Sequence, residues 1–439
     1  MAIALKESED FYLKDFREFE DRQAATAPAW LSKLRSEGMQ AFAELGFPTT
    51  KLEDWKYCNV SPVAGVRFVP APYELTDKIR KQVKELPFAG LDCTRMVFVN
   101  GHYAEELSSV RDLPEGARIT NMARALTQEG AVTAHLGRYA KHRRHPFVAL
   151  NTAFVEDGAF IELPKGVAIE KPIGIIYVSA GGTEPWVAHP RNLVIAAQGS
   201  QATVVETYLG IDGGVYFNNA VTEIVAEENA HIDYVKFQDE SESAFHVATM
   251  LAYAARNAAA VTNSIQLGAR LGREEVTTVL DGEGAEAYLY GLYVTNGRQL
   301  LDNHTAIDHA QPHCSSREFY KGILDGKSTA VFNGKILVRK DAQKTDSKQS
   351  DKNLLLSEDA TINTKPQLEI FADDVKCTHG ATIGQIDPES IFYLRARGIG
   401  LEEARKLLIE AFASEIVDHV KFEPLRKQLK SALLAKMRS

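Results

Sequence analysis

A short recurring unit in the second half of the chain constrains the fold more than any other feature. Six times, small residues lead into a run of β-branched and aromatic residues that is typical of a strand. The units are anchored by six alanines, namely Ala202, Ala230, Ala259, Ala285, Ala330 and Ala360. Successive anchors are 28, 29, 26, 45 and 30 residues apart, so we expect one unit to be enlarged by an insertion.

A period near 28 residues, made of strands and turns without helices between them, predicts a solenoid of stacked β-coils. One coil cannot bury its own apolar side, so the core comes from stacking. The strand-rich texture extends from about residue 147 to about residue 386. An antiparallel sandwich or barrel also spaces its strands regularly, and periodicity alone leaves both folds open.

The strand-rich part is flanked by helical patterns. Apolar residues recur at helical spacing up to about residue 45, and Phe47-Pro48 ends that pattern. Further on, helical patches mix with short strands such as residues 96–99. We therefore predict a mostly helical N-terminal region over residues 1–140 and a β-helix core over residues 141–386.

The last fifty or so residues return to a helical pattern. Asp387 precedes Pro388, an arrangement that caps and starts a helix. Two more apolar-periodic segments follow, divided by Gly398 and Pro424. We predict a C-terminal helical region over residues 387–439. On the pattern alone it could cap the exposed end of the solenoid, which repeat folds require, or form a platform that docks another subunit.

Charge and hydropathy exclude several classes of protein. The formal net charge of −9 argues against general nucleic-acid binding, which needs concentrated Lys and Arg. The sequence has no apolar run of the length that spans a membrane, and acidic residues follow almost directly after the N-terminus, where an export signal would be apolar. We expect a cytoplasmic protein that neither spans a membrane nor is exported.

The four cysteines are far apart, at Cys58, Cys93, Cys314 and Cys377. Such sparse usage is no disulfide framework and fits a reducing compartment. A stable iron–sulfur cluster usually needs four thiolates, several of them closely spaced. Because this chain has no such run, any cluster that it handles must take part of its ligand set from elsewhere.

No motif in the sequence establishes a catalytic centre. The segment 322–328 looks like a phosphate-binding loop, but only three residues separate its glycines and a strand-like run follows where a helix should start. Neither a Gly-x-Ser-x-Gly elbow nor a dinucleotide fingerprint is present. We therefore expect a protein that is not an enzyme by itself.

Two groups of residues could bind metal. The densest set of soft ligands is His304, His309, His313 and Cys314. Pro312 prevents His309 and His313 from pairing on one helix, so we favour structural histidines there and expect no stable metal site.

The second group is Cys377 and His379. If this segment is extended, the two side chains project from the same face, because side chains alternate along a strand. A thiolate and an imidazole so placed could bind iron or form a nucleophile pair. A buried, inert cysteine beside a structural histidine is the alternative.

The segment 363–387 closely resembles the SufB/SufD family of iron–sulfur cluster assembly subunits, in its SufD branch. Segments 48–57, 309–324 and 391–399 are similar to the same family, so the resemblance covers nearly the whole chain. The sister branch, SufB, has Glu-His-Glu-Ala where this chain reads Cys-x-His-Gly-Ala, and often has clustered cysteines. This chain lacks such a cluster, which favours SufD.

The resemblance implies a right-handed parallel β-helix core, a heterodimer with SufB, and binding of the SufC ATPase through the C-terminal helices. It implies a non-catalytic scaffold whose position 379 helps to build a transient iron–sulfur cluster with a cysteine of SufB, whereas the role of Cys377 is less defined. The chain would bind no cofactor stably by itself and could form a homodimer when isolated. The alternatives are a SufB-like paralogue, a purely structural subunit and, less favoured, a β-helix enzyme acting on carbohydrates.

Overall fold

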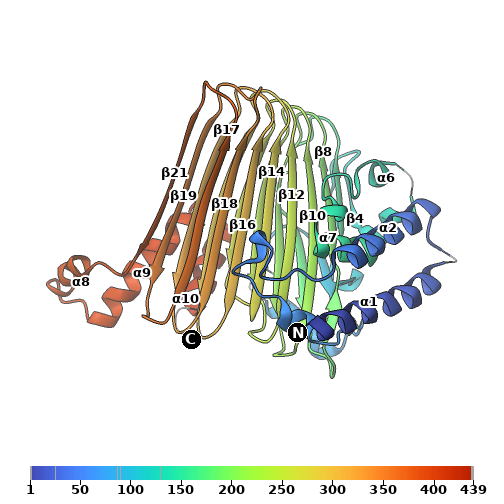
Figure 1. The fold of residues 1–439 in the computed structure, drawn as a ribbon, viewed down its shortest axis with the longest axis horizontal. Helices are drawn as coiled ribbons and strands as arrows, with labels where there is room; N and C mark the ends of the chain where they lie inside the picture. The colour runs from blue at the N-terminus through green and yellow to red at the C-terminus, as the bar shows by residue number, and fades with distance from the viewer. Residues whose placement is uncertain (1, 25, 87, 89, 129, 437–439) are drawn as a thin grey trace.

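The computed structural model describes residues 2–24, 26–86, 88, 90–128 and 130–436. Strand predominates over helix, and the core of the chain is a β-solenoid of about 8 turns built from two sheets, with helices at both ends of the chain (Figure 1). The fold class predicted from the period is confirmed.

The chain alternates between the two sheets, so that each full coil contributes one strand to each. The first sheet contains, in order, β4 (Arg118–Asn121), β5 (Ala159–Leu163), β8 (Arg191–Ala196), β10 (Tyr216–Ala226), β12 (Phe245–Ala254), β14 (Leu271–Leu280), β16 (Leu300–His309), β18 (Thr329–Val338) and β20 (Thr361–Ile370), and β1 (Val69–Pro70) and β7 (Trp186–Ala188) join it beside β10. The second contains β3 (His102–Tyr103), β2 (Thr94–Val99), β6 (Ile173–Ser179), β9 (Gln201–Gly210), β11 (His231–Asp239), β13 (Ala259–Gln266), β15 (Glu286–Thr295), β17 (Ser315–Leu324), β19 (Asp346–Leu355) and β21 (Lys376–Gly384).

Parallel pairing of strands one coil apart sets the register. In the first sheet, Phe217 pairs with Phe245, and Phe245 pairs with Leu271. In the second, His231 pairs with Ala259. Among the described residues, antiparallel strand pairs occur only where the solenoid begins, between β2 and β3 and between β4 and β5. An antiparallel sandwich, which the period had left open, is therefore excluded.

The insertion expected between Ala285 and Ala330 does not exist. Ala285 directly precedes β15 in the second sheet, whereas Ala330 lies in β18 of the first sheet, so the interval covers about one and a half coils. The buried Cys314 takes the place of an alanine before β17, 29 residues after Ala285. Because Cys314 stands where an alanine was expected, the alanine pattern skips one unit of a continuous repeat.

Most of the N-terminal region packs against the outer face of the first sheet, whereas the helix Asp77–Glu85 packs on β2 and β6 of the second sheet. Its helices are α1 (Ala2–Gln23), α2 (Ala29–Leu45), α3 (Ser61–Ala64), α4 (Asp77–Glu85), α5 (Met122–Leu126), α6 (Ala131–His135) and α7 (Pro146–Ala153), with 3-10 turns η1 (Glu53–Trp55), η2 (Glu105–Leu107) and η3 (His142–Arg144). The break expected at Phe47-Pro48 is confirmed, because α2 ends at Leu45. Phe42 and Phe147 pack in one cluster with Phe217 of the sheet. Strand β2 lies within the N-terminal 140 residues and yet pairs with β6 of the solenoid.

The segment 48–57 links the N-terminal region to later coils of the solenoid through side-chain contacts. The guanidinium of Arg273, on β14, lies 3.7 Å from the ring centroid of Trp55, and Arg273 is itself paired with Asp302 of β16. The carboxylate of Glu53 forms an ion pair with Lys365 of the last coil. These contacts extend along the first sheet from its middle strands to its edge.

The C-terminal region forms α8 (Pro388–Arg395), α9 (Leu401–Val417) and α10 (Glu423–Lys436). The predicted cap is confirmed, because the Asp387 carboxylate accepts hydrogen bonds from the backbone amides of Glu389 and Ser390. Helices α9 and α10 pack on the outer face of the second sheet, whereas α8 has no buried residue and projects from the body (Figure 1). The helices therefore do not cap the last coil. Among the described residues, no helix is long and apolar enough to cross a membrane.

Candidate functional site

The last coil leaves one end of the solenoid open. Strands β20 and β21 are the final strands of their sheets, and in the described part of the chain nothing pairs with their outer edges. Phe371, which follows β20, is 63% exposed, and Ile383 on β21 is 52% exposed. Unpaired backbone donors and acceptors beside exposed apolar side chains are a template for pairing with another chain.

Register shows which side chains face the solenoid interior at this end. Cys377 pairs with Ser347, and His379 pairs with Gln349, both of which are buried. The segment is extended, as the sequence analysis assumed, so Cys377 and His379 lie on one face of β21. That face is the inner one. In earlier coils such positions fill the core, whereas on the last coil they are open to whatever covers the end.

Cys377 and His379 have different environments. The Cys377 side chain is half-buried and packs against the core of the solenoid. Burial raises the pKa of its thiol, so the free protein holds it as a thiol rather than as a reactive thiolate. The His379 side chain is exposed, and none of the described residues forms a hydrogen bond or an ion pair with its imidazole.

Buried acidic residues lie in the coils directly behind His379. The Glu318 carboxylate accepts a hydrogen bond of 2.7 Å from Nε2 of Gln349, the strand neighbour of His379. Burial raises the pKa of Glu318 to about 7. Asp351 accepts hydrogen bonds from Tyr293 and Asn353, and burial raises its pKa to about 6.

The sequence analysis missed these interior acids, although β19 contains a signal for them. Its polar residues Ser347, Gln349, Asp351 and Asn353 are spaced two apart, and all four are buried. Alternation along a strand places such a row on one face. For a segment assigned as a strand of the solenoid, an all-polar row on the inner face predicts a polar interior.

The structure does not bring His304, His309, His313 and Cys314 together. His309 points into the core, where its Nε2 lies 2.9 Å from the Ser316 hydroxyl and burial lowers its pKa to about 4. His304 lies on the opposite face of the same strand, beside Asp302. His313 is exposed on a turn, and Cys314 is buried with its Sγ directed at the Gly282 carbonyl. Among the described residues, no group of three or more His, Cys, Asp or Glu is arranged to hold a metal ion.

The side chains at the open end could bind iron, but they are too few to hold an iron–sulfur cluster alone. A neutral imidazole and a thiolate both bind iron, and an imidazole can replace a thiolate as a cluster ligand. Cys377 and His379 supply two such groups, fewer than a cluster needs. A complete ligand set at this place requires groups from a second chain.

Comparison with known proteins identifies the class of this chain. The model of the SufBD core domain of the SUF system for iron–sulfur cluster assembly matches residues 178–412, and the model of the SufBD N-terminal region matches residues 6–175. The two matches together cover nearly all of the solenoid and the N-terminal region. The chain belongs to the SufB/SufD family of iron–sulfur cluster assembly proteins.

Named relatives place it near SufD within that family. It is 33% identical to the iron–sulfur cluster assembly protein SufD of Escherichia coli, over 89% of this chain and 89% of that protein. It is also 33% identical to a SufBD family iron–sulfur cluster assembly protein of Synechocystis, over 93% of this chain and 92% of the relative. The SufD protein of Bacillus subtilis is 27% identical over 97% of both chains.

Proposed function

We propose that this chain is the scaffold subunit of a SufBCD-type complex that assembles iron–sulfur clusters, and that it does not catalyse a reaction alone. The observation that carries the proposal is the position of Cys377 and His379, on the inner face of an edge strand that another chain can complete. The partners are a SufB-type subunit and a SufC-type ATPase, and the cluster is the cargo rather than a resident cofactor. The likeness to proteins named SufD supports this assignment.

The SufB-type subunit pairs with the open end of the solenoid. Edge strands β20 and β21 offer backbone hydrogen bonds to added strands, and the exposed Phe371 and Ile383 offer apolar area beside them. A partner with the same fold and its own open end would continue both sheets. Its side chains would then face Cys377 and His379 across a shared seam.

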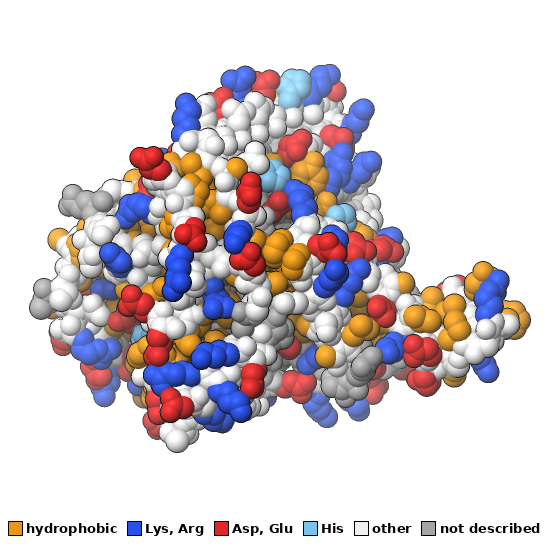
Figure 2. Space-filling view, turned by 180° about the vertical axis from the view of Figure 1, so that it is seen from behind, with side chains coloured by type: hydrophobic (Ala, Val, Ile, Leu, Met, Phe, Trp, Pro, Cys, Tyr) orange, Lys and Arg blue, Asp and Glu red, His pale blue; other side chains and the backbone are white. Residues whose placement is uncertain are grey.

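The SufC-type ATPase binds the C-terminal helices. Phe392 and Tyr393 of α8 are 74% and 56% exposed, and α8 has no buried residue. Beside its base lies a groove lined by Ile383, Leu408 and Phe412 among others. Figure 2 shows hydrophobic side chains gathered on the projecting end of the molecule. Such an apolar patch on an otherwise charged surface marks a protein contact.

In this mechanism, closure of the ATPase subunits is transmitted through the C-terminal helices to the last coils. Helix α9 is tied to strand β17 by Lys321, which donates a hydrogen bond of 2.8 Å to the Phe412 carbonyl and pairs with Glu415. Movement of α9 would therefore pull on the sheet that ends in β21. Opening of the seam would bring His379, and Cys377 once it has lost its proton, to iron held also by SufB ligands.

Co-expression with SufB-type and SufC-type subunits tests the proposal. We compare the wild-type complex with His379→Asn and with a control, His313→Asn, which removes another exposed histidine at a turn where asparagine is tolerated. The His379 variant should co-purify normally but yield less iron and acid-labile sulfide per complex, and the control should match the wild type.

Each of the other possible outcomes would refute a particular part of the proposal. Unchanged iron and sulfide in the His379→Asn complex would remove the ligand role and leave a purely structural subunit. Failure of the wild-type chain to co-purify with either partner would refute the scaffold assignment. A homodimer that persists in the presence of SufB would refute pairing through the open end.

A further inference from the structure

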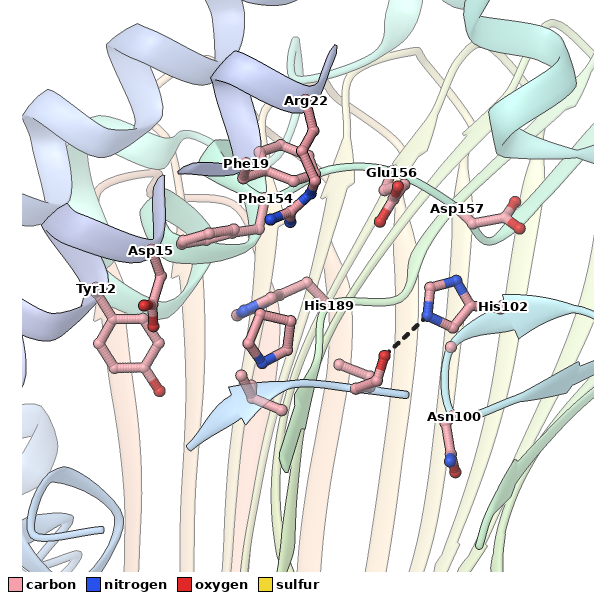
Figure 3. A pocket seen from close by; sticks show the side chains of 15 residues that line it. Tyr12, Asp15, Phe19, Arg22, Asn100, His102, Phe154, Glu156, Asp157 and His189 are labelled. Carbon is pink, nitrogen blue, oxygen red and sulfur yellow. Dashed lines mark hydrogen bonds between the residues drawn. The ribbon is translucent and has the colours of Figure 1, made fainter. Parts of the chain in front are cut away.

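A groove with a volume of about 520 Å³ lies on the outer face of the first sheet, beside the segment that follows α6. A groove of this size is comparable to the sites in which proteins bind other molecules. The hollow between α1 and the first coils, by contrast, has a volume of only about 80 Å³ (Figure 3). That is less than the cavity of about 150 Å³ that holds one benzene molecule. Of these two sites, only the groove can hold part of another molecule.

Outer rows of the first sheet form the floor of the groove. Val225, Tyr253 and Val279 are in register on β10, β12 and β14, and Leu251 lies two positions before Tyr253. The side chains of Leu251, Tyr253 and Val279 are half-buried. None of them belongs to the hydrophobic clusters in which the N-terminal helices pack on this sheet. The floor therefore offers apolar side chains to a partner.

The groove is elongated across the strands. In the row that contains Val279, the next positions are Asp308 on β16 and Leu337 on β18. Arg339, directly after β18, lines the far side of the groove. From β10 to β18 there are four strand spacings, or about 19 Å. This length suits a segment of a protein better than a compact small molecule.

The wall of the groove is the segment that follows α6. The rings of His135 and Tyr139 are stacked, with centroids 5.9 Å apart, and Nδ1 of His135 lies 2.9 Å from the Tyr139 hydroxyl. The ring of Tyr139 also packs against Tyr253 of the floor, with centroids 5.4 Å apart. Nζ of Lys141 donates a hydrogen bond to the Arg138 carbonyl. These contacts fix the wall beside the floor.

The same segment carries a concentrated positive charge. Residues 131–155 contain no Asp or Glu, although the whole chain has a net charge of −9. Four cations of this stretch are exposed, namely Arg138, Lys141, Arg143 and Arg144. Among the described residues, only Arg143 of these four forms an ion pair, with Glu37 at 3.6 Å. Arg138 and Lys141 line the groove, and the other two continue the basic stripe beyond it.

The carboxylates that line the groove have other partners. Glu227, directly after β10, accepts a hydrogen bond of 3.2 Å from the backbone amide of Gln198. Asp281, directly after β14, accepts a hydrogen bond from the Tyr253 hydroxyl. In the part of the chain that the structure describes, neither forms an ion pair with Arg138 or Lys141. The two cations of the wall are therefore available to acidic groups of a partner.

We propose that this groove binds an acidic, amphipathic helix of a further protein. Strand β12 is paired on both sides, with β10 and β14, so the floor cannot accept an added strand. A helix needs only side-chain contacts, such as those that α9 makes on the outer face of the second sheet. The apolar side of the helix contacts the floor, and its acidic side pairs with Arg138 and Lys141.

This partner is additional to the SufB-type and SufC-type subunits proposed above. The groove lies on the opposite sheet from α9 and α10, and its floor is formed by inner strands of the first sheet rather than by the edge strand β20. Binding in the groove therefore does not depend on the proposed function of the open end.

Fluorescence anisotropy with the full chain and three synthetic peptides tests the proposal. The probe is a labelled helical peptide of about 14 residues, long enough to span the groove at 1.5 Å per residue, with leucines along one face and glutamates beside them. A second peptide has lysine in place of every glutamate, and a third has alanine in place of every leucine. The first should bind about tenfold more tightly than either of the others, and added salt should weaken its binding.

Paired substitutions then locate the binding site. Arg138→Gln combined with Lys141→Gln should weaken binding of the acidic peptide about fivefold, the effect of losing two exposed ion pairs. The control is Lys14→Gln combined with Arg17→Gln, which removes two exposed cations with the same spacing from α1, outside the groove. The control should bind the acidic peptide as the wild type does.

Three results would overturn the proposal. The first is equal binding of the acidic and basic peptides, and the second is binding of the acidic peptide that the Arg138 and Lys141 substitutions leave unchanged. The third is tighter binding of single-stranded oligothymidylate than of the acidic peptide, lost in the same variant, which would assign the basic stripe to nucleic acid instead.

Discussion

Glu318 is a carboxyl group placed where a solenoid normally has an apolar side chain, and its protonation is therefore linked to folding. Burial raises its pKa from an ordinary 4.5 to about 7. Between these values the folded chain holds a proton that the unfolded chain has lost, so the stability falls as the pH rises through this window and levels off above it. A shift of this size corresponds to roughly 3 kcal/mol above pH 7.

Replacing Glu318 by glutamine should therefore stabilise the protein in a pH-dependent way. Glu318→Gln keeps a polar side chain of the same size beside Gln349 but removes the cost of ionisation. We expect a gain of up to about 3 kcal/mol at pH 8 and almost none near pH 4.5, as measured by urea unfolding. Glu358→Gln, at an exposed position, serves as the control. An equal gain at both pH values would contradict the linkage.

Single residues also show what the sequence could reveal. The shared inner face of Cys377 and His379 follows from strand alternation, and the structure shows the extended strand on which that reasoning depends. The interior acids Glu318 and Asp351 were missed because charged residues are rarely core residues, and the all-polar alternating row of β19 marks a polar interior only once that segment is assigned as a strand. That His309 and His304 point to opposite faces was equally unpredictable before the strand was assigned. Side chains alternate along a strand, and these two residues are an odd number of positions apart.

At the scale of elements, the segment after α6 is held to the first sheet by a buried ion pair. Glu223 of β10 pairs with Arg191 of β8, and both side chains are almost completely buried. The same carboxylate accepts hydrogen bonds from the backbone amides of Gly137, Tyr139 and Ala140. One side chain therefore joins two strands and a loop.

Removing that carboxylate should be among the most damaging substitutions in the chain. Glu223→Ala leaves the Arg191 charge buried without its partner and three amides without an acceptor, which should cost about 3–5 kcal/mol. Thermal or urea unfolding measures the loss, and Glu228→Ala, at a half-exposed turn position where the carboxylate forms only a surface ion pair with Arg256, is the control. A loss no larger than that of the control would show that the loop does not depend on the pair.

The C-terminal helices give a second prediction at this scale. Lys321 is almost fully buried beneath α9, where it also lies 4.0 Å from the ring centroid of Phe412. Lys321→Met keeps the apolar stem but removes the hydrogen bond to the Phe412 carbonyl and the ion pair with Glu415. We expect faster amide hydrogen exchange over residues 401–417 and weaker binding of the ATPase subunit.

The control for Lys321 is Lys427→Met, which removes an exposed lysine of α10 that pairs only with Glu423 of its own helix. It should leave the exchange of α9 unchanged. If both variants behave like the wild type, α9 is held by its apolar face alone, and the proposed transmission from helix to strand loses its physical basis.

At the scale of the whole molecule, the repeat in the sequence predicted the architecture because every coil solves the same packing problem. A small buried residue is needed where the chain turns into the next strand of the second sheet, and Ala230, Ala258, Ala285 and Cys314 meet that need. The anchors Ala202, Ala259 and Ala330 lie one or two positions further on, inside their strands. The position of the helices relative to the coils was not predictable in this way. Whether α9 and α10 cover the open end or the flank depends on the apolar outer face of the second sheet, which becomes visible only when the strands are assigned to two sheets.

The last prediction concerns the open end, and it distinguishes positions on the inner face of the edge strands from positions on their outer face. Ala381 lies on the inner row of β21, in register with the buried Asp351, whereas Gln367 lies on the outer row of β20. A lysine at position 381 would place a charge inside a continued solenoid, where burial without a partner is costly. A lysine at position 367 would point away from that interior.

We therefore expect Ala381→Lys to abolish co-purification with the SufB-type subunit while the ATPase subunit still binds, and Gln367→Lys to leave both interactions intact. Size-exclusion chromatography with light scattering of the co-expressed subunits measures the composition of each complex. Both variants should unfold at the same denaturant concentration as the wild type, because position 381 is exposed in the isolated chain. Retention of the SufB-type subunit by Ala381→Lys would mean that the partner does not continue the interior of the solenoid, and His379 would then have no shared seam in which to bind iron.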